Sequence, residues 1–262
     1  MEVNYKKLGI AYNIFDDSIE LLEKSILSVR NVADYITVIY QDISNMGNQS
    51  EINLKELLTD FKERGLINSF YLYKPQLNAP IPHINEMNKR NMGLYVCQGE
   101  GCTHFMSMDS DEFYKEDELK MVLQVMVEGD YDSSACQLQT YWKSGEWVLD
   151  PPEEYYVSLI YKIRYGVDFV LGHVFPVLVD PTRRMKPGNC KIFTRDEVEM
   201  YHASYVRNDI AKKLFNSSSI SSFGDIIEDL INYFNNWKEG DKAFMPDRNK
   251  YDLKKVENLF NI

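Results

Sequence analysis

The sequence predicts an α/β fold with a mainly parallel central sheet flanked by helices. Over the first 130 residues, short runs rich in β-branched and aromatic residues alternate with segments whose apolar residues recur every three or four positions. Hydrophobic residues make up 44% of the 262 residues, which is enough for a substantial core. Alternating strands and helices are typical of a parallel sheet covered on both faces.

The first half of this pattern begins with an apolar strand over residues 7–15. The helix predicted over 16–34 carries apolar residues at three- and four-residue steps, and Asp17 followed by Glu20 is a start signal. A β-branched and aromatic strand over 35–42 follows. The helix predicted over 53–65 opens on Asn53 and ends at a glycine.

The second half repeats the order. A strand over 67–75 precedes a weaker helix over 85–101, and the apolar strand over 103–113 ends in acidic residues. The helix over 115–129 has acidic residues in its first turn, where the helix dipole favours them. The order of elements is therefore four strands, each followed by a helix.

Beyond residue 130 the predicted order changes from alternating strands and helices to strands separated by turns. We predict strands over 134–142, 155–165 and 168–180, a helix over about 205–215 and a linker over 216–222. Residues 223–237 form an amphipathic helix with an acidic polar face, which is expected to pack on the domain or to form a homo-oligomer. The predicted organisation is a domain over 1–220 and a C-terminal helical extension over 221–262.

Charge and cysteine usage exclude several classes of protein. The net charge of −11 disfavours nucleic acid and anionic membranes as partners, because both attract basic surface. The four cysteines form no C-x-x-C pair and are interpreted as buried thiols in a reducing compartment, with a cytoplasmic location. No signal peptide or transmembrane segment is expected.

The sequence FMSMDSDEFY places Asp109 and Asp111 at the end of the fourth predicted strand. Ligands of open α/β sheets bind at this end of the strands. Residues i and i+2 of a strand share a face, so the two carboxylates should face one way and attract a divalent cation, with Glu112 pointing oppositely. The alternative is a solvated acidic loop. P-loop, dinucleotide and nucleophile-elbow motifs are absent.

Three stretches together resemble nucleotide-sugar glycosyltransferases of the GT-A fold, of the family 2 type. DSD at 109–111 resembles the D-x-D motif, NKRNMG at 88–93 resembles the ARN-x-G helix, and 12–29 resembles the opening strand and helix. The sequence departs from the family where Ile14 and Gln41 replace acidic residues. The resemblance covers residues 7–130 and implies a Rossmann-like sheet.

The resemblance also implies roles for individual residues. The segment EMYHASYVRND at 199–209 is similar to a late histidine segment, which implies that His202 joins Asp109 and Asp111 at Mn²⁺ or Mg²⁺. The residues implied at the nucleotide are Asn13, Asp42, Arg90 and Asp109. The basic residues Arg183, Arg207 and Lys213 are candidates for phosphate contacts. The candidates for a catalytic base are Glu153, Glu154 and Asp150.

The expected function is therefore metal-dependent transfer of a sugar from a UDP- or GDP-sugar to the hydroxyl of a glycan or another acceptor, in glycan synthesis. Two alternatives stay open. A sugar nucleotidyltransferase would share the metal and the fold class, although its glycine-rich phosphate loop is missing. A degenerate transferase that only binds a nucleotide sugar or a glycan would explain Ile14 and Gln41.

Overall fold

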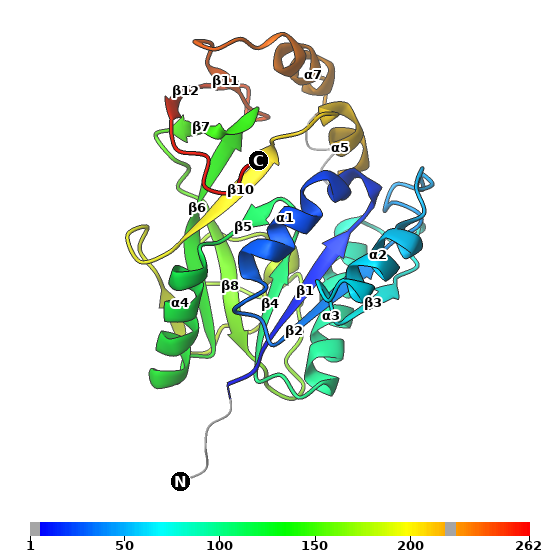
Figure 1. Ribbon diagram of the computed structural model, residues 1–262, viewed down its shortest axis with the longest axis vertical. Helices are drawn as coiled ribbons and strands as arrows, with labels where there is room; N and C mark the ends of the chain where they lie inside the picture. Colours follow the sequence, from blue (N-terminus) through cyan, green and yellow to red (C-terminus); the bar gives the residue numbers. More distant parts are fainter. Residues whose placement is uncertain (1–5, 218–223) are drawn as a thin grey trace.

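The computed structural model describes residues 6–217 and 224–262 as a central sheet with helices on both faces (Figure 1). Its first half follows the predicted alternation of strands and helices. These elements are β1 (Leu8–Ile14), α1 (Ile19–Val29), β2 (Tyr35–Tyr40), α2 (Leu54–Glu63), β3 (Ser69–Leu72), α3 (His83–Gly99), β4 (His104–Met108), β5 (Glu112–Phe113) and α4 (Glu116–Glu128). A short 3-10 turn, η1 (Asp16–Ser18), precedes α1.

The second half contains more strands than the sequence predicts. Its elements are β6 (Ser133–Trp142), β7 (Ser144–Asp150), β8 (Tyr156–Lys162), the 3-10 turn η2 (Pro181–Arg183), β9 (Cys190–Ile192), β10 (Glu199–Tyr205), α5 (Ile210–Asn216), α7 (Ile226–Asn236), β11 (Ala243–Phe244) and β12 (Lys250–Lys255). Strands β7, β9, β10, β11 and β12 were not predicted, and the predicted linker over 216–222 lies mostly outside the described residues.

The strand order across the main sheet is β11-β12-β7-β6-β8-β4-β1-β2-β3. Strands β1, β2, β3 and β4 are parallel, whereas β8 is antiparallel to both of its neighbours, β4 and β6. Strand β10 lies parallel to β6 and antiparallel to β5. The predicted α/β class with a mainly parallel core of strands is confirmed.

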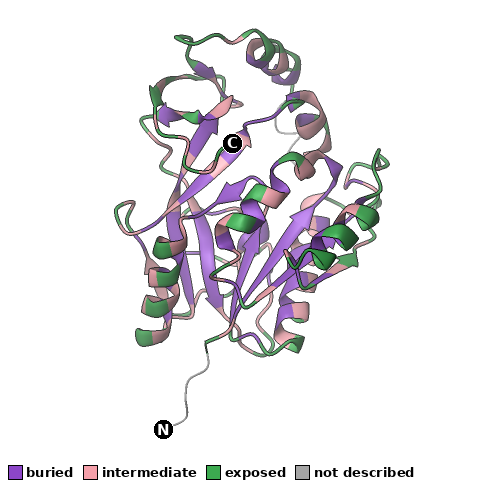
Figure 2. Cartoon of the chain, viewed as in Figure 1, coloured by how far each residue is buried: buried purple, intermediate pink, exposed green. Residues whose placement is uncertain are grey.

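Two hydrophobic layers cover the sheet. On one face α1, α2 and α4 pack through residues such as Leu22, Leu58 and Val122. On the other face α3 and the loop that follows β8 pack through Leu94 and Phe169. Figure 2 shows the buried strands between these partly exposed helices. The carboxyl ends of the parallel strands stay uncovered by either layer.

The prediction of a strand over residues 168–180 is wrong, because this segment is irregular. Phe169, Phe175 and Val179 are buried, while Val174 and Leu178 are exposed. A proline at position 176 lacks the amide hydrogen that a sheet needs. The segment therefore buries its apolar residues as a loop against α3 instead of joining the sheet.

The C-terminal helix that the sequence predicts is α7. Its apolar residues pack against α5, Trp142 of β6 and the β11–β12 hairpin. Strand β12 pairs antiparallel with β7, which joins the hairpin to the main sheet. The apolar face of α7 is thus covered by its own chain, and the predicted division at residue 220 falls outside the described residues.

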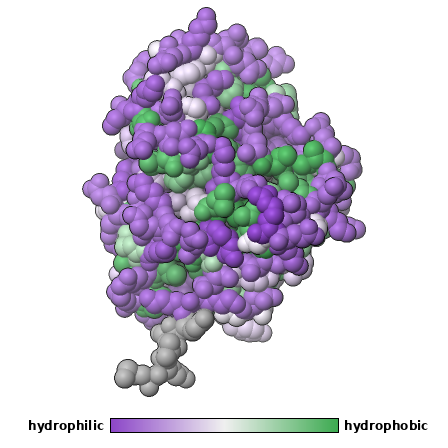
Figure 3. Space-filling view, in the orientation of Figure 1, coloured by the Kyte–Doolittle hydropathy of each residue, from purple (hydrophilic) through white to green (hydrophobic). Residues whose placement is uncertain are grey.

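The surface and the helices agree with the composition. Hydrophilic residues predominate on the face shown in Figure 3, with hydrophobic residues gathered near its middle. No helix among residues 6–217 and 224–262 has the length and apolar character that crossing a membrane requires. Cys97, Cys102 and Cys136 are buried free thiols, and Cys190 is half-buried.

Gly93 allows α3 to approach β1 closely. A Cβ atom at this position would lie 2.4 Å from the Cβ of Ala11. Gly93→Ala is therefore expected to destabilise the fold by about 1–3 kcal/mol through overpacking, measured by urea unfolding. The control is Gly99→Ala at the end of the same helix, where a Cβ would have no heavy atom within 4 Å. Equal midpoints for the two variants would contradict this account of Gly93.

Candidate active site

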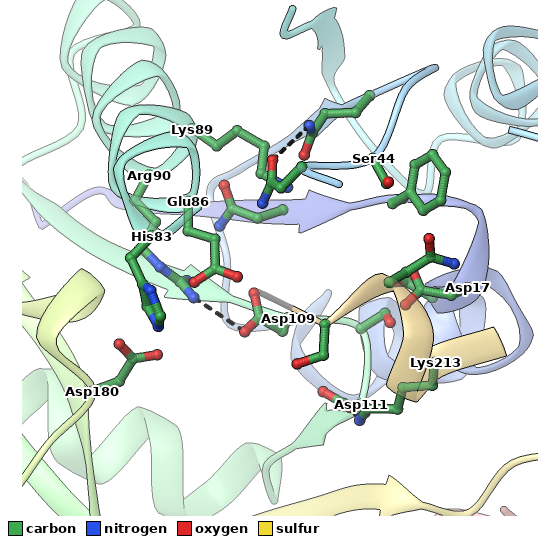
Figure 4. Close-up of a pocket in the computed structure, with 18 of the residues that line it drawn as sticks. Asp17, Ser44, His83, Glu86, Lys89, Arg90, Asp109, Asp111, Asp180 and Lys213 are labelled. Atoms are coloured by element: carbon green, nitrogen blue, oxygen red, sulfur yellow. Dashed lines mark hydrogen bonds and ion pairs between the residues drawn. The ribbon is translucent and has the colours of Figure 1, made fainter. Parts of the chain in front are cut away.

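A cavity of about 430 Å³ lies at the carboxyl ends of β1, β2 and β4. Strand β1 pairs with β2 on one side and with β4 on the other, so the strand order changes direction at β1. Open α/β sheets bind ligands at such a switch point, because the strand ends diverge there and leave a crevice. Figure 4 shows the side chains that line this cavity.

Asp109 and Asp111 lie in a turn between β4 and β5, not in a strand as predicted. Strand β4 ends at Met108, and the amide of Glu112 donates to the carbonyl of Asp109 at 3.2 Å, which closes the turn. Strand alternation therefore does not set the directions of the two carboxylates. Each is held instead by its own pair of cations.

The first pair holds Asp109. Arg90 of α3 donates to its Oδ2 at 3.1 Å, and Arg183 of η2 donates to the same oxygen at 2.6 Å. Arg90 is fixed in turn by Ser107 and Thr182, which accept its other donors at 2.8 and 3.3 Å. Burial alone would raise the pKa of Asp109, but the two guanidinium groups hold it well below its usual range.

The second pair holds Asp111. Arg207, which follows β10, and Lys213 of α5 donate to its Oδ2 at 2.8 and 2.5 Å. Against the effect of burial, these two cations hold the pKa of Asp111 well below its usual range. Burial lowers the pKa of Lys213, which Asp111 counteracts. Oδ1 of Asp111 accepts no hydrogen bond from the described residues.

Glu112 was expected to point away from the two aspartates; it does not line the cavity, but it meets Asp109 at the guanidinium of Arg183. Its buried carboxylate accepts from Arg183 at 3.2 Å through Oε2 and makes a second contact with the same guanidinium through Oε1. Arg183 therefore bridges Glu112 and Asp109. Burial raises the pKa of Glu112 to about 7, although Arg183 acts in the opposite direction. Arg183 does not line the cavity and lies beneath it.

His202 lies on β10 and lines the cavity beside Asp111. Its Nε2 is 3.9 Å from Oδ1 of Asp111. Burial lowers the pKa of His202 to about 4, so the imidazole is neutral at pH 7. A neutral imidazole nitrogen and a carboxylate oxygen therefore face the same small space.

These donors fit a divalent cation that takes its other ligands from substrate and water. Mg²⁺ is commonly bound by one or two protein carboxylates together with substrate phosphates, not by a protein cage. Oδ1 of Asp111 and Nε2 of His202 are two such donors. No group of three histidine, cysteine, aspartate or glutamate side chains in residues 6–217 and 224–262 is arranged as a metal site.

The end of the cavity nearest β1 and β2 is lined by polar side chains. Asn13 lines the cavity, and its Oδ1 has no hydrogen-bond partner among the described residues. Gln41 also lines it and donates to the carbonyl of Ile43 and to Asn45. Asp42, which was expected at the nucleotide, is exposed and lies outside the lining. Gln41, and not Asp42, is thus the residue of this segment that faces the cavity.

The three candidates for a catalytic base lie outside the cavity lining. Asp150 is exposed at the end of β7, opposite Asp252 of β12. Glu154 is exposed, and Glu153 accepts a hydrogen bond from Thr140 of β6. Strand β7 carries this loop toward the C-terminal hairpin, which the sequence analysis did not foresee because β7 itself was not predicted.

Several cavity residues were missed by the sequence analysis. They are Asp17, His83, Glu86, Lys89 and Asp180. Lys89 precedes Arg90 in the NKRNMG motif, so the motif gave a signal for it; its side chain is buried, and burial lowers its pKa. Asp17 was interpreted only as the start of a helix. The others lie in segments with no motif, such as the loop after β8, and only the fold brings them to the strand ends.

The fold and the cavity together define an α/β protein with a highly charged cavity at the switch point of its sheet, lined by four basic and five acidic side chains. No family model matches the sequence, and a search of curated proteins finds no relative. Solved structures similar to the chain include TarS of S. aureus, with a TM-score of 0.48 and 12% identity over 89% of this chain and 44% of TarS.

Two further similar structures are complexes with UDP. TarS 1–349 in complex with UDP has a TM-score of 0.43 and 11% identity over 89% of this chain and 73% of that one. GalNAc-T7 with UDP, GalNAc and Mn²⁺ has a TM-score of 0.49 and 12% identity over 88% of this chain and 50% of that one. The chain spans less than half of TarS and half of GalNAc-T7. The function proposed below rests on the residues that line the cavity.

Proposed function

We propose that the chain is a glycosyltransferase that moves a sugar from a nucleoside diphosphate sugar to an acceptor hydroxyl in glycan synthesis. The observation that carries this proposal is the arrangement of Asp109 and Asp111 at the switch point, each held by its own pair of cations. The aspartate pair orders Arg90, Arg207 and Lys213 at the ends of the parallel strands, which places three cations where an anionic ligand can bind.

The nucleoside end of the ligand would bind toward β1 and β2. The unpartnered Oδ1 of Asn13 is an acceptor for an N–H or O–H group of the nucleoside. Gln41 and Ser44 add further polar groups at this end, and Phe15 adds an aromatic ring. UDP- and GDP-sugars both offer donors that suit this end, and the polar lining does not separate them.

The diphosphate would bind where Arg90, Arg207 and Lys213 line the cavity. Guanidinium groups bind phosphate oxygens in a bidentate manner, and the lysine adds a compact charge. Arg183 contributes by fixing Asp109 and Glu112 beneath the floor. In the reaction these cations stabilise the negative charge that develops on the leaving diphosphate.

Asp111 and His202 are the residues that would hold Mn²⁺ or Mg²⁺, and Asp109 would contribute through water or the ribose. When bound, the cation supplies a Lewis acid that neutralises the diphosphate as it leaves. The cations of the chain would orient the diphosphate without it.

The proposal is tested by the thermal unfolding of the chain with UDP and GDP, with Mn²⁺ or with EDTA. A saturating ligand at 100 times its Kd adds about 2.7 kcal/mol to the stability. For a chain of this size, that is a rise of about 5–10 °C in Tm. We expect a rise with one of the nucleotides and a larger rise when Mn²⁺ is added. The absence of any rise with either nucleotide would contradict the proposal.

Release of UDP or GDP from a panel of nucleotide sugars separates the transferase from a degenerate member that only binds. The pairing of both aspartates with cations is the observation that favours the degenerate alternative, because it leaves fewer oxygens for a metal. Binding without release of the nucleoside diphosphate would support that alternative.

A further inference from the structure

The cavity has two ends, one on each side of Asp109. Figure 4 shows Asp111 and Lys213 on one side of Asp109, with Asp17 near them, and shows His83, Glu86 and Asp180 on the opposite side. The first end holds Arg207 and Lys213, two of the cations that would neutralise a leaving diphosphate. The second end holds carboxylates that make no ion pair with a described cation, and a carboxylate of this kind is free to accept a proton.

Asp180 is held firmly at the second end. It is the N-cap of η2, and its Oδ1 accepts from the amide and the hydroxyl of Thr182 at 2.7 and 2.8 Å. These two bonds fix the plane of the carboxylate. Its Oδ2 has no hydrogen bond or ion pair with the described residues, and the residue lines the cavity.

The turn that carries Asp180 is itself anchored to the sheet. The carbonyl of Arg183 accepts from the hydroxyls of Ser158 and Tyr161 at 2.9 and 2.7 Å. The side chain of Arg183 reaches Asp109, and Arg90 donates to the hydroxyl of Thr182. One network therefore sets the position of Asp180 relative to Asp109, although 71 positions of sequence separate them.

The other carboxylates of the lining are less suited to take a proton from an acceptor. Asp109 and Asp111 are paired with cations that hold their pKa values low. Asp17 lies at the diphosphate end beside Lys213. Glu86 lies on α3 close to Lys89, and its carboxylate interacts electrostatically with the buried ammonium group of Lys89. Asp180 combines a carboxylate fixed by two hydrogen bonds with an Oδ2 that makes no ion pair with the described cations.

We infer that Asp180 is the general base of the reaction, an assignment that rests on the proposed function. Oδ2 of Asp180 accepts the proton of the acceptor hydroxyl as the hydroxyl oxygen forms its bond to the anomeric carbon. The bond from that carbon to the diphosphate breaks, and its electron pair leaves with the nucleoside diphosphate. Attack from the side opposite the leaving group inverts the anomeric configuration.

The test uses hydrolysis of UDP-GlcNAc, UDP-glucose and GDP-mannose, in which water is the acceptor. Removal of a general base lowers the rate by about 10²–10⁴-fold. Asp180→Asn should therefore lower the release of nucleoside diphosphate to this extent, with its affinity for the nucleotide and its Tm unchanged. Asp196→Asn, the same change at an exposed residue outside the cavity, is the control and should keep the wild-type rate.

Azide distinguishes a base from a residue that only shapes the loop. Azide carries no proton, so it attacks the anomeric carbon without a base. In Asp180→Ala, azide should restore the release of nucleoside diphosphate and yield a glycosyl azide of inverted configuration. The assignment would be overturned if Asp180→Asn hydrolysed the nucleotide sugars at the wild-type rate. It would also be overturned if azide failed to restore the release of nucleoside diphosphate by Asp180→Ala. A wild-type chain that binds no nucleotide would overturn the proposed function as well.

Discussion

Asp111→Asn is expected to lower the turnover of the nucleotide sugar by about 10²–10³-fold, the usual effect of removing a group that stabilises developing charge. In the wild type one carboxylate oxygen holds both Arg207 and Lys213, and the other faces His202. An amide keeps the size of the side chain but has no charge with which to hold two cations. It is also a poor ligand for a divalent cation. Initial rates of UDP or GDP release measure the effect.

The same variant should separate the binding of the nucleotide from the effect of the metal. Loss of a negative charge next to two cations leaves the cavity more positive, so the affinity for UDP in EDTA should be retained or increased. The additional affinity that Mn²⁺ provides in the wild type should disappear. Titration calorimetry with and without Mn²⁺ measures both quantities. An equal Mn²⁺ effect in the variant and the wild type would show that Asp111 is not a metal ligand.

The stability of the Asp111→Asn variant has to be measured separately from its activity. Breaking a buried ion pair by removing one partner costs about 3–5 kcal/mol, because the other charge stays buried. The side chain of Arg207 is 2% exposed, so it cannot turn to water. Rates are therefore compared at a temperature well below the Tm of the variant. Asp229→Asn, at an exposed position on α7, controls for the chemical change alone.

The alternation of strands and helices up to α4 was predictable because each element has its own local signal. Ile19, Leu22 and Ile26 repeat with the period of a helix, and β2 is a run of β-branched and aromatic residues. Beyond α4, strands β6 and β8 have such a signal and were predicted, whereas β7 and β9 to β12 lack one. Strands β9 and β10 exist because they pair with β6, at positions more than 50 residues away along the chain. Pairing at this distance leaves no local pattern to detect.

The same distinction between local signals and long-range contacts explains which residues of the site could be predicted. Asp109 and Asp111 could be predicted from a short motif, whose acidic pair was recognised although its conformation was taken as a strand. The partners of these two aspartates could not be assigned, because Arg183, Arg207 and Lys213 lie 74, 96 and 102 positions away. Glu112 was dismissed by strand alternation, which does not hold in a turn. Asp180 had no motif at all.

Arg183→Met is expected to destabilise the protein by about 3–5 kcal/mol, because it leaves the buried carboxylate of Glu112 without its cation. The side chains of Arg183 and Glu112 are 6% and 3% exposed, so water cannot replace the lost contact. Arg64→Met is the control. Arg64 pairs with Glu23 and Asp60 at the surface, and removing an exposed pair costs about 0–1 kcal/mol. Urea unfolding of both variants measures the difference.

The double variant Glu112→Gln/Arg183→Met should be more stable than Arg183→Met alone, because a neutral amide needs no cation beneath the cavity. Residues in direct contact show coupling energies of about 0.5–3 kcal/mol in such a cycle. Additive effects of the two single changes would contradict the role of Arg183 as the partner of Glu112. The double variant should still bind nucleotide more weakly than the wild type, since Asp109 has lost one of its two guanidinium groups.

The pH dependence of the protein's stability gives an independent test of the pair formed by Glu112 and Arg183. Burial raises the pKa of Glu112 from 4.5 to about 7, so between these values the folded protein binds more protons than the unfolded chain. Stability linked to this group is therefore present at low pH and is lost as the pH rises toward 7. Without Arg183 only a proton can neutralise Glu112, so the loss should steepen and extend to higher pH in Arg183→Met. Unfolding at pH 5 and at pH 8 should thus show the variant closer to the wild type at pH 5, and Glu112→Gln should remove the difference.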